Sequence, residues 1–371
     1  MNRAPGRAGR FVPASTDNPS VDHPVHPLVS VIIVVTNEIH HVRRCLPTLT
    51  RQTYPNYEVV VVDNESTDGT REFIDSQFPT VRVIRSGGNL GYPGANNLGF
   101  EHANGDFLAV LNPDTEVHPD WISSLVQALS TDPDAGLATS RILLMSDRSR
   151  VNACGNNVSL PGLTFCRGVN EPAWHYEDPC DVTAVSGAAF MVRRSVIDEI
   201  GPFDPDFVAY LEETDLSLRA LLAGHRSIYV PNSIVWHDYE FRFNARKCFH
   251  IEKNRLAMLA KNFSVRTLLL LSPILLATEL MVWAYVFTHG LAHVRAKAAS
   301  YLWLLKNVGT IAEHRTRIQQ IRRVSDRDVL AHFVPGLPMQ QVTSGRFGNW
   351  LERAVSRVFR VVSDVSLRYS G

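Results

Sequence analysis

Acidic residues follow two short apolar runs in the first third of the chain. Asp63 directly follows the run Val59–Val62, and Asp114 stands shortly after Leu111 in the sequence Asn112-Pro-Asp. A continuous apolar run of this kind is typical of a parallel strand that is buried on both faces. In open α/β sheets, the carboxyl ends of such strands border the crevice in which ligands bind. The two strand ends therefore predict a site for a nucleotide and a metal ion.

A further acidic pair, Glu212 and Glu213, stands at the start of an expected amphipathic helix. Acidic side chains in a first helical turn interact favourably with the helix dipole, so helix stability alone could explain this pair. His237 follows the apolar run 234–236. A lone histidine beside such a run is more often a packing residue than a ligand. For both groups, a structural and a chemical interpretation remain open at this point.

Glycines are concentrated between Gly87 and Gly99. Their spacing does not form the GxGxxG pattern that opens a helix after a first strand, so a nicotinamide dinucleotide is not expected. Two interpretations remain for this stretch, because glycine tolerates positive φ wherever a chain must turn. It is either a plain loop or a loop whose backbone lies close to a base or sugar, with amide contacts from Asn96 and Asn97.

The elements that must position these residues follow a regular order. We expect strands over 29–35, 57–62, 81–85 and 107–111, with helices over 39–52 and 67–78. Strands that alternate with helices of this length indicate βαβ units and a mainly parallel, Rossmann-like α/β sheet. A chain of 371 residues with 45% hydrophobic residues can bury a large core, so we expect one large domain with appendages.

Charge and cysteine content narrow the possible partners. Lys plus Arg and Asp plus Glu number 37 each, so the overall charge favours no particular partner, and we expect no nucleic acid. The five cysteines are odd in number and form no CxxC pair, which argues against a disulfide framework and a zinc site and indicates a reducing compartment. Residues 1–27 lack the apolar core of a signal peptide, and we expect them to be disordered.

The C-terminal part, residues 264–371, differs from the rest in being apolar and basic. Residues 267–288 are long enough to cross a bilayer, but they include Pro273 and Glu279, and a buried carboxylate is costly in hydrocarbon. We therefore expect hairpinned helices in or on the membrane surface, followed by a basic amphipathic helix over 350–362. The alternative is that these helices pack on the catalytic domain or on a second copy of the chain in a homo-oligomer.

Five motifs in order carry a resemblance to a known family. They are Ser30–Asn37, Asp63–Gly69, Asn89–Tyr92, Asn112–Asp114, and Ser186–Arg193 followed by Glu212–Asp215. This series resembles that of the family-two inverting glycosyltransferases of GT-A fold, and it is most similar to bacterial rhamnosyltransferase-type enzymes. The resemblance extends from about Leu28 to Phe263, and residues 28–263 are accordingly expected to form the catalytic domain.

The resemblance implies a nucleotide-diphosphate sugar donor and a divalent metal ion, Mg²⁺ or Mn²⁺. The donor contacts it implies are Asn37, Asp63, Ser66, Asn89, Gly91, Asn96 and Asn112, with Asp63 on the base or ribose. Asp114 matches the second acid of the family's DXD motif and is expected to bind the metal, which His237 would help to hold. Asn112 replaces the first acid of that motif, and its amide is expected to contact the sugar or ribose instead.

The resemblance also places the catalytic base in the acidic pair. Glu213 occupies the usual position of the base, and we expect the helix N-terminus to keep it ionised at neutral pH. Glu212 would orient the acceptor or the base, although the two roles could be exchanged. Thr36 stands where the family often has an aromatic residue, so stacking on the base would come from elsewhere, for example from Tyr92.

The implied function is inverting, metal-dependent transfer of a sugar, with rhamnose as one candidate, to a hydroxyl of a lipid-linked or polysaccharide acceptor in cell-envelope glycan synthesis. The expected location is the cytoplasmic face of the plasma membrane. Two alternatives remain. One is a catalytically impaired nucleotide-sugar-binding or scaffold protein, which Asn112 and Thr36 would allow. The other is a nucleotidyltransferase, which the glycine-free sequence Thr36–His41 argues against.

Overall fold

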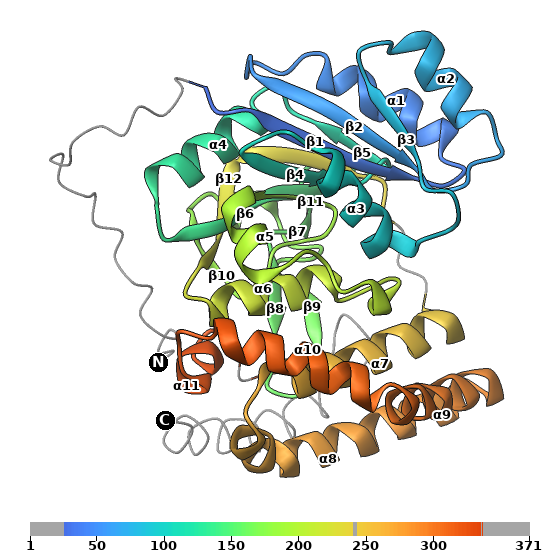
Figure 1. The fold of residues 1–371 in the computed structure, drawn as a ribbon, viewed down its shortest axis with the longest axis vertical. Helices are drawn as coiled ribbons and strands as arrows, with labels where there is room; N and C mark the ends of the chain where they lie inside the picture. Colours follow the sequence, from blue (N-terminus) through green and yellow to red (C-terminus); the bar gives the residue numbers. More distant parts are fainter. Residues whose placement is uncertain (1–25, 240–242, 335, 337–371) are drawn as a thin grey trace, which may run out of the picture.

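The computed structural model describes residues 26–239, 243–334 and 336 of the chain. A ten-stranded sheet carries helices on both faces, and a set of C-terminal helices lies at one side of the molecule (Figure 1). The basic amphipathic helix expected over 350–362 lies outside the described residues, as does nearly all of the segment 1–27.

The N-terminal half has the expected alternation of strands and helices. Its elements are β1 (Val29–Val35), α1 (Ile39–Leu49), β2 (Tyr57–Asp63), α2 (Thr70–Gln77), β3 (Arg82–Arg85), α3 (Gly91–His102) and β4 (Phe107–Leu111). β1 pairs in parallel with both β2 and β4, and β2 pairs in parallel with β3. The expected strands are therefore confirmed, while α1 ends earlier and α2 begins later than expected.

The second half completes the sheet with strands of both directions. Its elements are β5 (Thr115–Val117), α4 (Trp121–Thr131), β6 (Ala135–Leu144), β7 (Val151–Ala153), β8 (Asn156–Val158), β9 (Thr164–Cys166), η1 (Ala173–His175), β10 (Cys180–Val182), β11 (Ala189–Arg193), α5 (Arg194–Ile200), η2 (Pro205–Phe207), α6 (Glu212–Leu222) and β12 (Arg226–His237). The strand order is β10-β12-β6-β11-β4-β1-β2-β3. β11 is antiparallel to both of its neighbours, so the sheet is mixed and mostly parallel.

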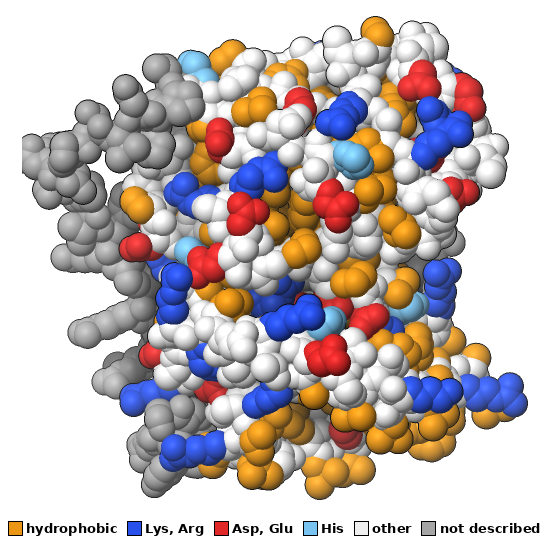
Figure 2. Space-filling model, in the orientation of Figure 1, with side chains coloured by type: hydrophobic (Ala, Val, Ile, Leu, Met, Phe, Trp, Pro, Cys, Tyr) orange, Lys and Arg blue, Asp and Glu red, His pale blue; other side chains and the backbone are white. Residues whose placement is uncertain are grey.

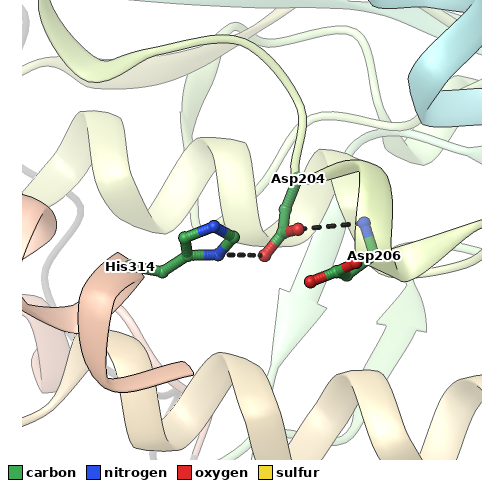
Figure 3. Close-up of side chains that lie close together, drawn as sticks. All are labelled: Asp204, Asp206 and His314. Carbon is green, nitrogen blue, oxygen red and sulfur yellow. Dashed lines mark hydrogen bonds and ion pairs between the residues drawn. The ribbon is translucent and has the colours of Figure 1, made fainter. Parts of the chain in front are cut away.

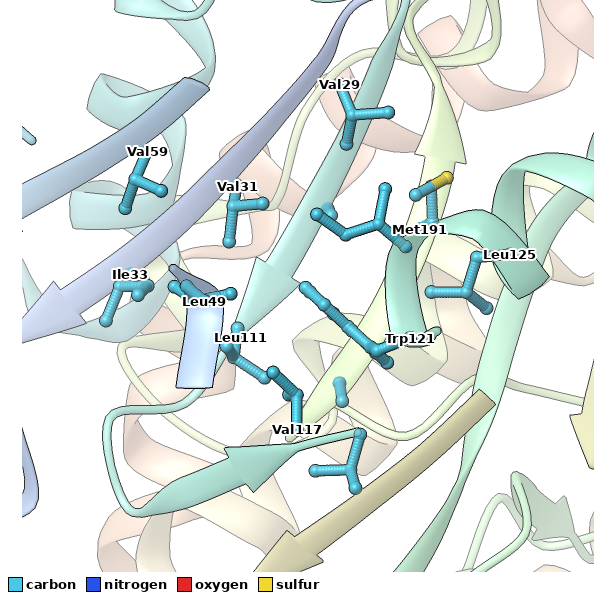
Figure 4. Packing of buried hydrophobic residues seen from close by; sticks show 14 of the residues in the cluster. Val29, Val31, Ile33, Leu49, Val59, Leu111, Val117, Trp121, Leu125 and Met191 are labelled. Carbon is cyan, nitrogen blue, oxygen red and sulfur yellow. The ribbon is translucent and has the colours of Figure 1, made fainter. Parts of the chain in front are cut away.

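Strand β1 explains why the sheet needs helices on both faces. Alternate residues of a strand point to opposite faces, and Val31 and Ile33 join the cluster that α1 and α4 cover, whereas Ile32 joins the cluster under α3 and α6. On the first face, Trp121 of α4 is fully buried against the sheet (Figure 4). Its indole nitrogen donates to the Ser140 hydroxyl at 2.9 Å, which satisfies the polar atom of this large core residue.

The glycine-rich stretch was expected to be a loop, and this expectation is wrong. Only its beginning, through Leu90, is irregular; residues from Gly91 onward form α3. Gly99 lies inside this helix where an added Cβ would come within 2.4 Å of the Ile32 side chain, so a glycine is needed for close packing on β1. Here glycine is required by helix–sheet packing and not by a turn, a distinction that composition alone does not make.

The C-terminal region is helical, as expected. Within residues 264–371 it comprises α8 (Val265–Thr288), α9 (Leu291–Lys306), α10 (Val308–Ile321) and α11 (Asp326–Leu330), and α7 (Ala245–Asn262) directly precedes it. Among the described residues, α8 is long and apolar enough to cross a membrane by length and composition. Its apolar side chains share one buried cluster with α6, α7 and α10, represented by Leu271, Leu218, Met258 and Ile318. The region is therefore joined to the sheet domain by a common core.

A buried ionic network connects α7, α8 and α9. Arg255 of α7 is fully buried, pairs with Glu252 at 2.8 Å and also contacts Glu279 of α8. Lys297 of α9 is buried as well and pairs with Glu279 at 2.7 Å and with Glu252. Tyr301 donates a further hydrogen bond to Glu279. The carboxylate that makes α8 an unfavourable membrane span is thus paired to cations of neighbouring helices.

We expect replacement of Arg255 by Leu to lower the free energy of unfolding by about 3–5 kcal/mol, because it leaves two buried carboxylates with a single ammonium partner. Urea unfolding followed by tryptophan fluorescence measures this change. Arg71→Ala is the matched control, since the half-exposed pair of Arg71 with Asp75 spans one helical turn and contributes about 0.5 kcal/mol or less. A loss below about 1 kcal/mol for Arg255→Leu would contradict the interpretation of the network as a stabilising unit.

Candidate functional site

Loops from three neighbouring strands meet at the carboxyl ends of β1 and β2. Asn64, which is buried, holds them together: its backbone N–H donates to Val35 at 2.8 Å, and its side-chain amide donates to Asn89 at 3.2 Å. Its side-chain oxygen accepts from the backbone of Leu90 at 2.9 Å. Sequence reasoning did not identify Asn64, although it directly follows Asp63. Its role depends on contacts between loops that are distant in sequence.

The loop after β2 is closed by residues that were expected to bind the donor. The Asp63 Oδ1 atom accepts from the backbone N–H of Ser66 at 2.9 Å, which is the structural role considered for this carboxylate. The Ser66 hydroxyl accepts from the backbone of Asn37, and the Asn37 side chain accepts from Thr67 at 2.8 Å. Asn37 has a φ of 58°, a conformation that asparagine tolerates better than most residues. The structure thus brings Asn37, Asp63 and Ser66 together.

The start of α3 has a packing role. Gly91 has a φ of +68°, and an added Cβ would lie 2.8 Å from the carbonyl oxygen of Val208. Asn89 accepts from the Gly91 backbone, and the Tyr92 backbone donates to the same Val208 carbonyl. Asn96 is fully buried and donates to the Tyr92 carbonyl at 2.9 Å within the helix. This placement argues against the expected contact of Asn96 with a base or sugar.

Asp114 and His237 come together because β5 pairs with the end of β12. The His237 Nε2 atom lies 3.2 Å from Asp114 Oδ1, an ion-pair distance without the geometry of a good hydrogen bond. On the other side of the ring, His237 Nδ1 lies 2.9 Å from the side-chain oxygen of Asn152, an acceptor that fixes the proton on Nδ1. Burial raises the pKa of Asp114, but the contact with His237 outweighs it, and the pKa lies below its ordinary value.

These atoms form a candidate cation site. With one proton held on Nδ1 by Asn152, loss of the proton from Nε2 would leave a lone pair beside a carboxylate oxygen, an arrangement that a shared cation would stabilise. The side-chain oxygen of Asn112 lies in the same loop and is buried without a hydrogen-bond partner among the described residues. A carboxylate oxygen, an amide oxygen and an imidazole nitrogen are suitable ligands for Mg²⁺ or Mn²⁺.

A second group of possible ligands lies elsewhere in the described chain. Atoms of Asp204, Asp206 and His314 approach within 4.8 Å of one another, and His314 contacts Asp204 at 3.1 Å (Figure 3). However, the buried ammonium of Lys261 already pairs with Asp204, and it lies 3.3 Å from Asp215 as well. Because this cation already pairs with Asp204, the group has less need of a metal than the Asp114 loop.

The acidic pair begins α6, as expected, and its environment is unusual. Glu212 is buried, and its Oε2 atom has no hydrogen-bond partner among the described residues. Glu213 accepts from the Asn156 amide at 3.1 Å and from the Thr214 hydroxyl at 3.2 Å. Burial, and then the charge of Glu213, raise the pKa of Glu212 well above its ordinary value. Burial raises the pKa of Glu213 too.

Burial therefore works against the expected effect of the helix N-terminus on Glu213. Removal of a carboxylate from water favours its neutral form, and here this effect exceeds the stabilisation by backbone N–H groups at the helix start. Asn156 moderates the effect by donating to the carboxylate. It stands in no recognisable motif, and only the folding of β8 against the sheet domain brings it to the site.

Tyr92 links the acidic pair to the loop of Asp114. Its hydroxyl donates to the Gly187 carbonyl at 2.8 Å, and the Cβ position of Gly187 lies 3.6 Å from the Glu213 carboxylate. Burial, followed by the charges of Glu212, Glu213 and Asp114, raises the pKa of Tyr92 well above its ordinary value. The charges of all three carboxylates therefore act on one phenol. A helix start and a strand end far apart in sequence contribute to a single polar site.

Comparison with known proteins agrees with this geometry. The profile of Glycosyl transferase family 2 matches residues 30–201. An N-acetylglucosaminyl-diphospho-decaprenol L-rhamnosyltransferase of Mycobacterium tuberculosis is 31% identical over 57% of this chain and 76% of its own length. The profile match includes the strand-end motifs at Asp63 and Asp114.

Two solved structures are similar in fold. The Staphylococcus aureus TarS fragment 1–349, in complex with UDP-GlcNAc, superposes with a TM-score of 0.53 and 13% identity over 92% of this chain and 89% of that one. GalNAc-T7 with UDP, GalNAc and Mn²⁺ gives a TM-score of 0.54 and 20% identity over 64% of this chain and 48% of that one. Together with the sequence matches, they show that the chain belongs to glycosyl transferase family 2, the GT-A-fold enzymes that take their sugar from a nucleotide sugar.

Proposed function

We propose that the protein transfers a sugar from a nucleotide-diphosphate donor to a hydroxyl of a lipid-linked or polysaccharide acceptor, with inversion at the anomeric carbon. The observation that carries this proposal is that the segment Gly187–Ala188 lies between the two acidic groups: the Ala188 carbonyl accepts from the Asn112 backbone at 2.9 Å, and the Cβ position of Gly187 lies 3.6 Å from the Glu213 carboxylate. A carboxylate that can accept a proton and a group that can hold a metal on a leaving diphosphate are the two requirements of a single displacement.

Asp114 and His237 would hold the metal, with the Asn112 oxygen close by in the same loop. Two observations support this fit: the Nε2 atom of His237 lies close to Asp114, and the buried Asn112 oxygen lacks a partner among the described residues. When bound, Mg²⁺ or Mn²⁺ supplies positive charge that stabilises the departing diphosphate. Asn152 keeps the histidine in the tautomer that can act as a ligand.

On the donor side, Asp63 and Asn37 would contact the nucleoside from the loops after β2 and β1, and Ser66 and Asn89 would hold these loops in place. The hydrogen bonds that join Asp63 to Ser66 and Asn37 to Thr67 support this assignment, because they fix the loops before any ligand binds. Fixed donors and acceptors reduce the entropy that a ligand loses on binding.

On the acceptor side, Glu213 would take the proton of the attacking hydroxyl. As the oxygen of the acceptor bonds to the anomeric carbon, the bond from that carbon to the diphosphate breaks, and its electron pair leaves with the diphosphate. Glu212, whose pKa is raised further, would stay protonated and orient the hydroxyl or its base. A pair of carboxyl groups with separated pKa values is a common way to divide such roles.

The name of one relative suggests which donor sugar and which acceptor to test first. The Mycobacterium tuberculosis relative is named as transferring L-rhamnose to an N-acetylglucosaminyl diphosphate carried on decaprenol. We therefore propose rhamnose as the first donor sugar to test and a polyprenyl-diphosphate sugar as the first acceptor. A thermal-shift screen of nucleotide sugars with Mn²⁺ would identify the donor, because a ligand that binds the native state raises its stability.

We further propose that α8 and α9 lie on the cytoplasmic face of the membrane, where a lipid-linked acceptor would be reached. The outward side chains of these helices are apolar and more than half exposed; they include Leu269, Leu276, Leu280, Phe287 and Leu305. Apolar side chains line this edge of the molecule, with Lys and Arg side chains beside them (Figure 2). The pairing of Glu279 with Arg255 favours a surface position over a span, because it ties α8 to the catalytic part.

For the metal, we expect Asp114→Asn to abolish transfer and to remove the Mn²⁺-dependent thermal shift with a nucleotide diphosphate, while the fold is kept. Asn152→Ala should raise the metal concentration needed for half-maximal activity about 10- to 100-fold, since it removes the acceptor that orients His237. Asp147→Asn, on an exposed turn, is the control and should change neither property. Full activity of Asp114→Asn would refute the metal assignment.

For the base, we expect Glu213→Gln to lower kcat by ~10²- to 10⁴-fold with little change in donor KM. The raised pKa places the acidic limb of the wild-type kcat/KM profile above the ordinary glutamate range of about 4.3, because activity falls as protons occupy the base. Glu212→Gln should act mainly on acceptor KM. If Glu212→Gln loses turnover and Glu213→Gln retains it, the roles are exchanged; if both retain it, the chain is not the enzyme proposed.

For the membrane, we expect Leu276→Glu with Leu280→Glu to abolish co-flotation with vesicles that contain phosphatidylglycerol. Trp174→Glu is the control, because Trp174 is equally exposed but lies on η1, within the sheet domain. Release of the wild-type protein by carbonate supports attachment to the surface. Retention after carbonate would instead indicate that α8 spans the bilayer.

A further inference from the structure

The chain reaches the acidic pair through a turn of unfavourable backbone conformation. Val208, Tyr210 and Leu211 have φ values of 63°, 69° and 67°. Positive φ is costly for bulky residues and above all for a β-branched residue such as Val208, so such a turn persists only where its surroundings hold it. The next two residues are Glu212 and Glu213, and the conformation of this turn therefore sets where their carboxylates lie.

Helix α7 contacts the turn through one buried amide. The Asn254 side-chain nitrogen donates to the carbonyl oxygens of Phe207, Ala209 and Tyr210 at 3.1, 2.8 and 2.7 Å. Asn254 is 1% exposed, so no water replaces these contacts if the amide is lost. Three of the carbonyls that frame the strained residues thus depend on a single side chain from another helix.

Lys253, the preceding residue of α7, orients this amide. Its ammonium donates to the Asn254 side-chain oxygen at 2.8 Å, which forces the amide nitrogen toward the turn. The ammonium also donates to the Asp206 carbonyl at the start of the same segment, and it is 1% exposed. On the opposite side of the turn, the Tyr92 backbone donates to the Val208 carbonyl at 2.9 Å. The turn is therefore held between α3 and α7.

We propose that Asn254, oriented by Lys253, is a positioning residue for the transfer reaction: it holds the turn 208–211 so that the carboxylates of Glu212 and Glu213 face the site. The inference rests on the proposed function of the acidic pair. It assigns a catalytic purpose to α7, which lies beyond the residues that the family profile matches.

A purely structural role predicts a different result, and α7 supplies a matched control. Asn262, on the same helix, is also buried, and its amide donates to Asp215 at 3.0 Å and to Met258 at 2.9 Å without contact with the turn. Asn254→Leu and Asn262→Leu both replace a buried amide by an apolar side chain of similar size. Both should lower the unfolding midpoint, but only Asn254→Leu should change the kinetics.

The test measures kcat, donor KM and the pH profile of purified full-length protein with a nucleotide sugar and an acceptor. We expect Asn254→Leu to lower kcat on the order of 10²-fold, as expected when a catalytic group is misplaced by about 1 Å, with donor KM unchanged and the acidic limb displaced. Val208→Gly should restore part of kcat in the Asn254→Leu background, because glycine adopts a positive φ without the support of the Asn254 amide. If Asn254→Leu does not fold, Lys253→Met, which retains the amide, gives the same test.

Two outcomes separate this inference from the function on which it rests. In the Glu213→Gln background, Asn254→Leu should cause little further loss, because a positioning residue acts through the group that it positions. If the decreases in kcat of the two single variants multiply in the double variant, the positioning role is overturned. It is also overturned if folded Asn254→Leu has an unchanged kcat. If Glu212→Gln and Glu213→Gln both keep full turnover, the base assignment fails instead, whatever Asn254→Leu does.

Discussion

The site depends first on the parallel pairing of β1 with β2 and β4. This pairing places the carboxyl ends of three strands at one edge of the sheet, and the loops of Asn37, Asp63 and Asn112 begin there. The antiparallel strand β11 then returns the chain beside β4, so that the Ala188 carbonyl accepts from the Asn112 backbone at 2.9 Å. β11 ends with Arg193 beside Phe107 at the opposite edge of the sheet, and the chain returns through α5 and η2 to Glu212 and Glu213 at the start of α6.

Burial gives these polar groups their properties. In water, Glu212 and Glu213 would both be ionised near neutral pH, whereas their position under the sheet edge raises both pKa values. Asp114 is affected in the opposite direction because His237 lies beside it. The same site therefore contains two carboxyl groups whose pKa values are raised and one whose pKa is lowered. The groups around each carboxylate determine the direction of its shift.

The strands and the strand-end acids could be predicted from sequence, because a buried parallel strand has an apolar run that ends at a polar residue. The helix that contains Asn96 was not anticipated, since Gly99 is needed for the packing of α3 on Ile32 and not for a loop. The raised pKa of Glu213 was not anticipated, because the degree of burial depends on the whole fold. Asn152 and Asn156 could not be found, since they reach the site through β7 and β8, which have no motif.

Helix α7 has one further property that matters for anyone who wants a soluble fragment of this enzyme. Four consecutive buried polar residues face two ways: Lys253 and Asn254 contact the catalytic turn, whereas Glu252 and Arg255 pair with α8 and α9. A chain cut before α8 would leave the guanidinium without Glu279 and the carboxylate of Glu252 without Lys297, next to the residues that hold the turn. A soluble version would have to replace Glu252 and Arg255 together with apolar or neutral side chains, so that the trimmed helix keeps its alignment.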